Sequence, residues 1–244
     1  KGGAARALLL RSLGIDPHYV PRDVDVVRLV DQEPFAGADR EVGERFMAND
    51  LEDGYGVEGI ESREEYFETR DFTLNEVLAT DTEVLASRQC LLDSLRHIIR
   101  LTRYERTKDL LEIIPDKMLA KTLRFYTEAI HRYDEGAIRD VEEWELEERA
   151  ISAFWLAVQL DRAFEIGSGV AERFVDQLKR RGQIPKTIQD VEEAAVYLLK
   201  LLKGKSFYYR HAPTQQMDLE RQWIEEEFDG SSKLKRRYQR SSRR

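Results

Sequence analysis

The spacing of apolar and polar residues along the chain changes near residue 100. Before that point, short apolar stretches alternate with turn-rich segments, a pattern typical of mixed α and β structure. Residues 4–13 follow a glycine pair and predict a helix, whereas residues 23–30 alternate polar and β-branched side chains and predict a strand. Residues 55–67 are a further candidate strand, and residues 88–101 have leucine and isoleucine at helical spacing, which predicts a helix.

Almost every segment after residue 100 has helical period, and three apolar stripes predict three amphipathic helices. The stripes are Leu119, Leu123, Tyr126 and Ile130; Ile151, Phe154, Trp155 and Val158; and Val191, Ala195, Leu198, Leu199 and Leu202. Thr187 with Asp190 predicts the N-terminal cap of the third helix. The predicted fold is therefore an α/β head over residues 1–102, followed by an all-α neck and body over residues 103–230.

The composition adds limits on where the protein acts. With 41% hydrophobic and 35% charged residues, the chain can bury a core and should be very soluble. The longest apolar run, Ala7 to Leu10, is far too short to cross a membrane, so no membrane partner is expected. The single cysteine, Cys90, excludes an internal disulfide and is typical of a reducing cytoplasm, where we expect the protein to act.

The charge is unevenly distributed between the body of the chain and its end. The net charge is −8, but residues 233–244 contain seven Lys or Arg and no acid, so the remaining residues carry −15. Residues 231–244 are therefore predicted to form a basic tail that is disordered unless bound. The tail could track an RNA backbone, with Tyr238 available for stacking, and a terminal charge run without function is an equally weighted alternative. The candidate RNA-binding residues are Lys233, Lys235, Arg236 and Arg237.

Asp23 and Asp25 are the first candidates for chemistry. Side chains at positions i and i+2 of a strand project from one face, so these two carboxylates should point together. Paired carboxylates repel each other unless a cation lies between them, and on a rigid strand they suit Mg²⁺. Taken alone, a solvated edge strand is the commoner explanation of this spacing, so the pair gains weight only from its neighbours.

Two further segments have polar residues suited to nucleotide binding. Gly2 and Gly3 precede a helix with Arg6 in its first turn, and a helix N-terminus offers free N–H groups to phosphate. In the segment 70–75, Thr73 is expected to cap a short helix, which places Asn75 in its first turn. An ordinary loop before a helix and a charged helix entry are the structural alternatives for these two segments.

Taken together and in this order, the three segments resemble the head of the tRNA CCA-adding enzymes and bacterial poly(A) polymerases. That family has Gly-Gly-x-x-Arg-Asp-x-Leu-Leu, then Asp-x-Asp, then Arg-Arg-Asp-Phe-Thr-x-Asn-Ala. The corresponding segments here are Gly2-Gly3-Ala4-Ala5-Arg6-Ala7-Leu8-Leu9, Asp23-Val24-Asp25 and Thr69-Arg70-Asp71-Phe72-Thr73-Leu74-Asn75-Glu76. Residues 92–101 and 118–125 are similar to the end of the head and the first neck helix, so the likeness covers residues 1 to about 130.

The resemblance implies an α/β nucleotidyltransferase head and a template-independent reaction. It implies that an RNA acceptor, tRNA above all, receives AMP or CMP from ATP or CTP at its 3′ end, with Mg²⁺ as cofactor. Asp23 and Asp25 would hold the catalytic metals. The residues implied in nucleotide binding are Gly2, Gly3 and Arg6 for the triphosphate, Arg70, Asp71 and Asn75 for the incoming nucleotide, and Lys121 and Arg124 for base selection from the neck.

Several departures from the family pattern keep other functions open. Ala7 replaces an aspartate, Thr69 replaces an arginine and Glu76 replaces a small residue. Residues 145–149 have the ends of the family's base-selection motif, but Leu146 in the middle favours a solvated helix face. The alternatives are a divergent nucleotidyltransferase that modifies a protein or small molecule, and a helical RNA-binding module whose head is inactive.

Four aromatic residues of the predicted helical body have two interpretations. They are Trp144, Phe154, Trp155 and Phe164. The tendency of large aromatic side chains to be buried favours a place in the helical core over a binding platform.

Overall fold

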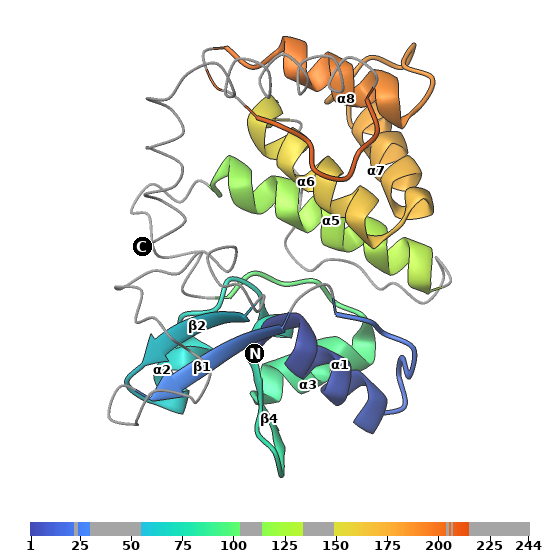
Figure 1. The fold of residues 1–244 in the computed structure, drawn as a ribbon. Helices are drawn as coiled ribbons and strands as arrows, with labels where there is room; N and C mark the ends of the chain where they lie inside the picture. Colours follow the sequence, from blue (N-terminus) through green and yellow to red (C-terminus); the bar gives the residue numbers. More distant parts are fainter. Residues whose placement is uncertain are drawn as a thin grey trace. The chain divides into compact units, whose positions relative to one another are not determined.

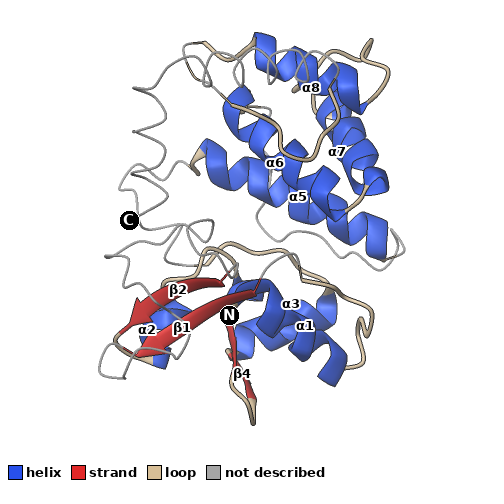
Figure 2. Ribbon diagram, in the orientation of Figure 1, coloured by secondary structure: helices blue, strands red, loops and turns tan. Residues whose placement is uncertain are grey.

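The computed structural model describes residues 1–21, 24–29, 55–102, 114–133, 149–203, 205 and 207–214. The chain divides into two compact units, the first running from Lys1 to Ile114 and the second having its described residues from Pro115 onward (Figure 1). Over these residues the fold is mixed α/β and mostly helical, with seven α-helices and two small two-stranded sheets (Figure 2). The predicted boundary at residue 102 adjoins residues outside the described ranges, and the tail 231–244 lies outside them too, so both stay predictions.

The first unit begins with helix α1 (Gly2–Ser12), followed by strand β1 (Val24–Leu29). Both lie where the sequence predicts a helix and a strand. Strand β2 (Tyr55–Ile60) pairs with β1 in parallel, with Val24 opposite Tyr55 and Leu29 opposite Ile60. The candidate strand 55–67 is wrong beyond residue 60, because Ser62 caps helix α2 (Arg63–Glu68) by accepting a hydrogen bond from the Glu65 N–H.

The remaining elements of the first unit are a 3₁₀ turn η2 (Thr73–Asn75), a β-hairpin and a helix. The hairpin consists of β3 (Val77–Ala79) and β4 (Val84–Ala86), and it leads into α3 (Arg88–Arg96). One core cluster of this unit joins Ala5 and Leu9 of α1 to Val77 of β3 and Cys90 of α3. The helix that carries the glycine pair is thus fixed against the hairpin that follows η2.

Helix α3 is shorter than the predicted helix over residues 88–101. It ends at Arg96 because His97 adopts a left-handed conformation with φ of 55°, and the Ile98 N–H bonds back to the Asp93 carbonyl at 2.8 Å. Leu101 then forms an antiparallel bridge with Phe72, which is fully buried. The apolar residues after the helix therefore hold the segment around residue 72 in place instead of extending the helix.

The described elements of the second unit are four helices, α5 (Asp116–Arg132), α6 (Ala153–Ile166), α7 (Ser168–Arg180) and α8 (Val191–Lys200). Helix α5 packs against α6 and α7, and α8 packs against α6 and α7. Of the two residues predicted to cap α8, Asp190 is confirmed, because it accepts from the Glu193 N–H at 2.8 Å, and Thr187 is not the capping residue. None of the helices over the described residues is long and apolar enough to span a membrane.

The first predicted stripe is buried at three positions, but the second lies on a different face of its helix. Phe154, Trp155 and Val158 are only half-buried. Helix α6 packs on three neighbouring helices, α5, α7 and α8. The side chains of α6 that are almost completely buried are instead those of Leu156, Ala157, Leu160 and Ala163. The core interpretation of Phe154 and Trp155 is therefore only partly right, since these rings lie at the edge of the packed helices.

Candidate functional site

The glycine turn at the start of α1 lies directly against strand β1. Gly2 has a φ of +58°, which a side chain would strain, and a Cβ atom there would lie 3.6 Å from Asp25 Oδ2. The Lys1 main-chain nitrogen donates to the Asp25 carbonyl oxygen at 2.7 Å. A Cβ atom on Gly3 would lie 3.4 Å from Pro21 Cβ, so the second glycine is also closely approached. The structure therefore brings two of the three sequence motifs together at the N-terminus of a helix.

The parallel pairing of β1 and β2 adds a second carboxylate to the face of Asp25. The register places Asp25 opposite Gly56 and Val27 opposite Glu58. Residues two apart in a strand share a face, and so do paired residues of neighbouring strands, which puts Asp25 and Glu58 on the same face of the sheet. Lys1 bridges them, because its main-chain nitrogen bonds to Asp25 and its Nζ forms an ion pair with Glu58.

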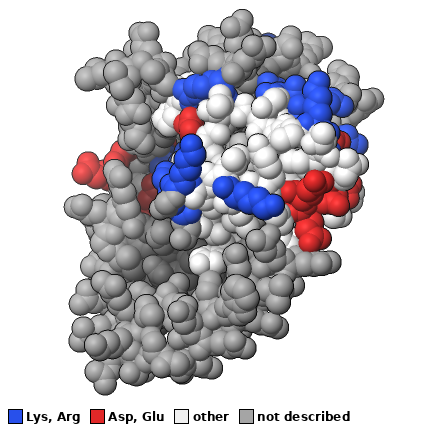
Figure 3. Space-filling view, turned by 90° about the horizontal axis from the view of Figure 1, so that it is seen from above, with Lys and Arg blue, Asp and Glu red and all other residues white. Residues whose placement is uncertain are grey.

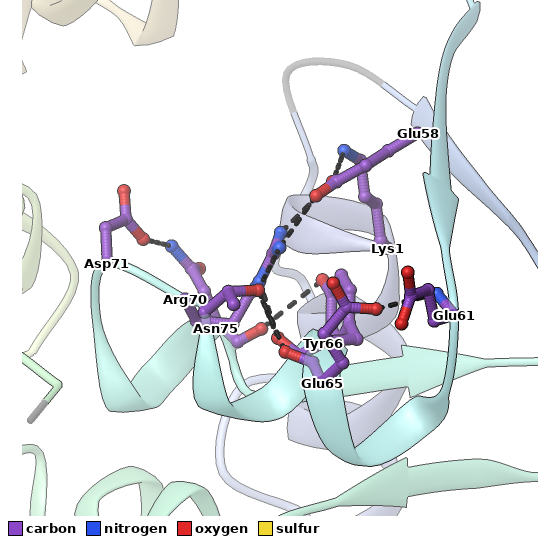
Figure 4. Close-up of polar contacts among 9 residues, drawn as sticks. Lys1, Glu58, Glu61, Glu65, Tyr66, Arg70, Asp71 and Asn75 are labelled. Atoms are coloured by element: carbon purple, nitrogen blue, oxygen red, sulfur yellow. Dashed lines mark hydrogen bonds and ion pairs between the residues drawn. The ribbon is translucent and has the colours of Figure 1, made fainter. Parts of the chain in front are cut away.

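Glu58 is the partner of Arg70, the arginine of the third motif (Figure 4). Arg70 Nη2 donates to Glu58 Oε1 at 2.7 Å and Nη1 donates to Oε2 at 3.2 Å, a two-pronged arrangement that fixes the guanidinium plane. Arg70 Nε donates to the Tyr66 carbonyl at 2.8 Å, and the guanidinium carbon lies 3.9 Å from the centre of the Tyr66 ring. Arg70 is therefore a cation whose position is set by its neighbours before any ligand arrives.

The protonation states of this cluster follow from its ion pairs and burial. Burial would raise the pKa of Glu58, but hydrogen bonds from Arg70 and Lys1 outweigh it and lower the pKa to about 2. The same contact raises the pKa of Arg70 against the opposing effect of burial. Burial raises the pKa of Tyr66 to about 12, so its hydroxyl keeps its proton and donates to the Asn75 carbonyl at 3.4 Å. At neutral pH the cluster thus holds a charged carboxylate, a charged guanidinium and a neutral phenol.

Asp71 and Asn75, the other residues of the third motif that are predicted to bind nucleotide, are joined to each other. Asp71 Oδ1 accepts from the Phe72 N–H at 2.9 Å and from Asn75 Nδ2 at 2.8 Å. The Thr102 N–H donates to the Asp71 carbonyl at 3.0 Å, which ties the segment to the chain after α3. The three polar residues Arg70, Asp71 and Asn75 therefore belong to one hydrogen-bonded turn.

Thr73 does not cap a helix, contrary to the prediction. Its hydroxyl donates to Asp93 Oδ2 at 2.6 Å, and Asn75 is the last residue of the 3₁₀ turn. Asp93 is almost fully buried and also accepts from Arg100 Nε at 3.0 Å. The buried carboxylate of Asp93 therefore fixes the 3₁₀ turn by its hydrogen bond with Thr73, which explains why the Thr73 side chain is buried.

Arg6 is directed into the first unit and packs against Tyr19. Its guanidinium donates to the Tyr19 hydroxyl and lies 4.7 Å from the centre of that ring, and the residue is 8% exposed. Its place in triphosphate binding stays a prediction.

Lys121 and Arg124, the predicted base-selecting residues, belong to α5 of the second unit. Arg124 is buried, donates from Nε to Gln159 Oε1 at 2.8 Å and forms an ion pair with Glu128, which is also buried. Lys121 is half-buried, with its Nζ 5.7 Å from the centre of the Phe125 ring. The two side chains thus differ in exposure, and the geometry gives Arg124 a role in the packing of the helical unit.

Some predicted residues lie outside the described ranges. They are Asp23, Trp144 and the tail residues Lys233, Lys235, Arg236, Arg237 and Tyr238. Over the residues that the structure does describe, no group of three or more His, Cys, Asp or Glu side chains is arranged to hold a metal ion. The Asp23–Asp25 metal pair therefore stays a prediction.

Two residues of the site were missed in the sequence. Glu58 is an acidic residue within the otherwise apolar and glycine-containing strand Tyr55–Ile60. Tyr66 belongs to helix α2 and lies four residues before Arg70, which follows that helix. An acid on the inner face of a strand and an aromatic ring one helical turn before an arginine were the available signals.

Chemically, the site combines a strand carboxylate, a helix N-terminus and a fixed arginine. The N–H groups at the start of the helix attract negative charge, while the positive charge of Arg70 is paired with Glu58. No family model and no curated protein matches the chain.

Proposed function

We propose that this chain is a template-independent RNA nucleotidyltransferase, with an α/β nucleotidyltransferase head and a helical neck and body. It adds AMP or CMP from ATP or CTP to the 3′ end of an RNA, tRNA above all, and releases pyrophosphate. One observation carries the proposal. The glycine turn at Gly2, the strand residue Asp25 and the guanidinium of Arg70 lie apart in the sequence and are linked in the structure. The Lys1 main-chain nitrogen donates to the Asp25 carbonyl oxygen, and Lys1 Nζ pairs with Glu58, the partner of Arg70.

The donor set suits Mg²⁺ as the cofactor of this reaction. Asp25 offers a carboxylate on a strand, beside the glycine turn, and Asp23, which lies outside the described residues, is two positions earlier in the sequence. Hard oxygen ligands are those that Mg²⁺ prefers. Asp23 and Asp25 would hold the metal, which supplies neutralisation of the negative charge on the triphosphate.

The protein groups around this pair would position the nucleotide. The N–H of Gly3, in the first turn of α1, is free of an intrahelical partner by position and suits a phosphate oxygen, whereas the Gly2 N–H contacts the Tyr66 hydroxyl. Arg70 adds a positive charge, and Asp71 and Asn75 lie in the same turn. The 3′ hydroxyl of the RNA attacks the α-phosphorus, the bond to the bridging oxygen of pyrophosphate breaks, and the hydroxyl proton passes to solvent.

The test offers the full-length protein a labelled tRNA that lacks its CCA end, with Mg²⁺ and each nucleoside triphosphate in turn. Addition of C and A alone supports CCA synthesis, and unlimited addition of A supports poly(A) synthesis. Labelling of protein instead of RNA favours the protein-modifying alternative, and RNA binding without any transfer favours the inactive module.

The same assay with Asp23→Asn and Asp25→Asn tests the metal pair. We expect each variant to lose transfer by roughly 100-fold or more, because the lost interaction stabilises charge in the transition state. Melting curves should show that Mg²⁺-ATP no longer stabilises either variant, while the metal-free stability is unchanged or slightly higher. Asp81→Asn, in the exposed turn between β3 and β4, is the matched control. Near-normal transfer by either variant would refute the proposal.

A further inference from the structure

The segment 207–212, here called the strap, is held firmly on the helices of the second unit. Asp161 of α6 accepts hydrogen bonds from three consecutive strap N–H groups, those of Arg210, His211 and Ala212, at 2.8, 2.7 and 3.2 Å. Tyr209 is completely buried, and its hydroxyl donates to the Ala195 carbonyl of α8 at 3.0 Å. The strap is thus attached to two helices at once, although it contains no helix or strand of its own.

At the start of the strap, the aromatic residues Phe207 and Tyr209 lie inward and Tyr208 between them lies outward. Phe207 packs edge-on against Phe154 and Tyr209, with ring centres 5.9 and 5.1 Å apart. Between the two inner rings, Tyr208 points outward and is 48% exposed. An aromatic ring that is exposed on a rigid backbone offers a flat surface whose ordering costs little conformational entropy.

Several exposed Lys and Arg residues lie close to this ring in the sequence. Residues 194–214 contain four Lys or Arg and no Asp or Glu, namely Lys200, Lys203, Lys205 and Arg210, and all four are exposed. Lys205 Nζ also lies 5.5 Å from the centre of the Phe154 ring, which places it beside the inner aromatic cluster. The face of the second unit seen in Figure 3 has Lys and Arg side chains spread across its described surface, with Asp and Glu mostly toward its margins.

The acidic residues near the strap oppose this charge only in part, since Glu165 is exposed beside His211 whereas Asp161 is buried. Asp161 is buried beneath the backbone and is occupied by three N–H groups. Glu165 lies 3.8 Å from His211. The other neighbouring acids, Glu192 and Glu193, belong to the first turn of α8, at the opposite end from Lys200.

We propose that Tyr208 and the exposed basic residues around it form a binding surface for single-stranded RNA. A base stacks on the ring of Tyr208, and the phosphates on either side contact Lys203, Lys205 and Arg210. A ring flanked by spaced cations matches the alternation of bases and phosphates along an unpaired strand. That the bound strand is the acceptor of the reaction rests on the proposed function, whereas the binding itself does not.

The experiment measures the affinity of the full-length protein for a fluorescently labelled, unstructured oligoadenylate at several salt concentrations. Tyr208→Ala should weaken binding by about 5-fold or more, because stacking on one aromatic ring contributes that much, whereas Tyr208→Phe should keep the affinity. The double variant Lys203→Ala with Lys205→Ala should reduce the salt slope of the binding constant by about 1.4, as expected for two lost phosphate contacts on a single strand. Lys186→Ala, in the loop before α8, is the matched control for charge.

The outcomes separate this surface from the proposed reaction. Wild-type affinity and an unchanged salt slope in both the Tyr208→Ala and the double-lysine variants would overturn the RNA surface. The RNA surface would also be overturned if Tyr208→Ala weakened binding to duplex RNA as much as binding to the single strand, because stacking requires an unpaired base. If the variants lose binding to vesicles of phosphatidylserine but not to RNA, the surface contacts a membrane instead. RNA binding that depends on Tyr208 in a protein without transfer activity would leave the surface intact and refute the reaction alone.

Discussion

Replacing Glu58 with glutamine tests how the candidate site is held together. The substitution keeps the size of the side chain but removes the charge that binds Arg70 and Lys1. Arg70 then keeps its bond to the Tyr66 carbonyl and its contact with the Tyr66 ring, but loses the two-pronged ion pair. We expect the first unit to be less stable as a result, with little change in its secondary structure.

The expected magnitude follows from the depressed pKa of Glu58. A change from its ordinary value of 4.5 to about 2 corresponds to a difference of about 3 kcal/mol between the charged and neutral forms. The Glu58 side chain is 31% exposed, so solvent screening reduces the contribution to the free energy of unfolding to roughly 1–2 kcal/mol. Because the pKa in the folded chain is lowered, this contribution is complete above pH 4.5 and is lost as the pH falls through about 2.

The assay is native-state hydrogen exchange of the amides in β1 and β2, which reports the stability of the first unit. The difference between wild type and Glu58→Gln should be largest at neutral pH and should fall by about half at a pH of about 3. Glu61→Gln, an exposed glutamate three residues later, should change the stability by less than about 0.5 kcal/mol at any pH. A Glu58→Gln effect that is no larger than that of the control, or that grows as the pH falls, would refute the reasoning.

Two further predictions concern the tail and the neck. Deletion of residues 233–244 should weaken RNA binding and flatten its salt dependence without changing the affinity for free nucleotide, and an unchanged salt slope in a binding titration would discard the tail as an RNA contact. Arg124→Met should lower the free energy of unfolding by about 3 kcal/mol, because it leaves Glu128 buried without its partner, and urea unfolding should show that Lys121→Met has a much smaller effect. If Arg124→Met instead keeps its stability and changes the ratio of nucleotides used, Arg124 reads the base and is not a packing residue.

The elements that local pattern determines were predictable from the sequence. Helix α1 and strand β1 lie where the apolar spacing predicts them, since neither depends on a distant partner for its type. The end of α3 was not predictable, because Leu101 has the apolar character of a helix face but bridges Phe72, which lies 29 positions earlier. The face of α6 was misread for a related reason, since Phe154 and Trp155 are large and apolar but lie where the neighbouring helices end their contact.

Some residues of the candidate site were also predictable from the sequence, and others were not. The order of the glycine pair, the aspartate pair and Arg70 indicates a common site, and the contact between Gly2 and Asp25 is consistent with it. Glu58 could not be identified as a site residue from the sequence. Its importance comes from the register of a parallel strand pair and from its ion pair with Arg70, which follows α2 in the sequence. Ion pairs of this kind depend on tertiary geometry, which residue type and spacing do not encode.

The attachment of the strap also has a consequence for the order in which the second unit folds. Arg210 lies 49 residues after Asp161, and Tyr209 lies 14 residues after Ala195, so the strap can dock only once α6 and α8 are side by side. The hydrogen bonds from the three N–H groups that share Asp161 therefore form late in folding, and they open only when the strap leaves α6. Exchange of the amides of Arg210, His211 and Ala212 thus follows the detachment of this one segment, apart from the rest of the unit.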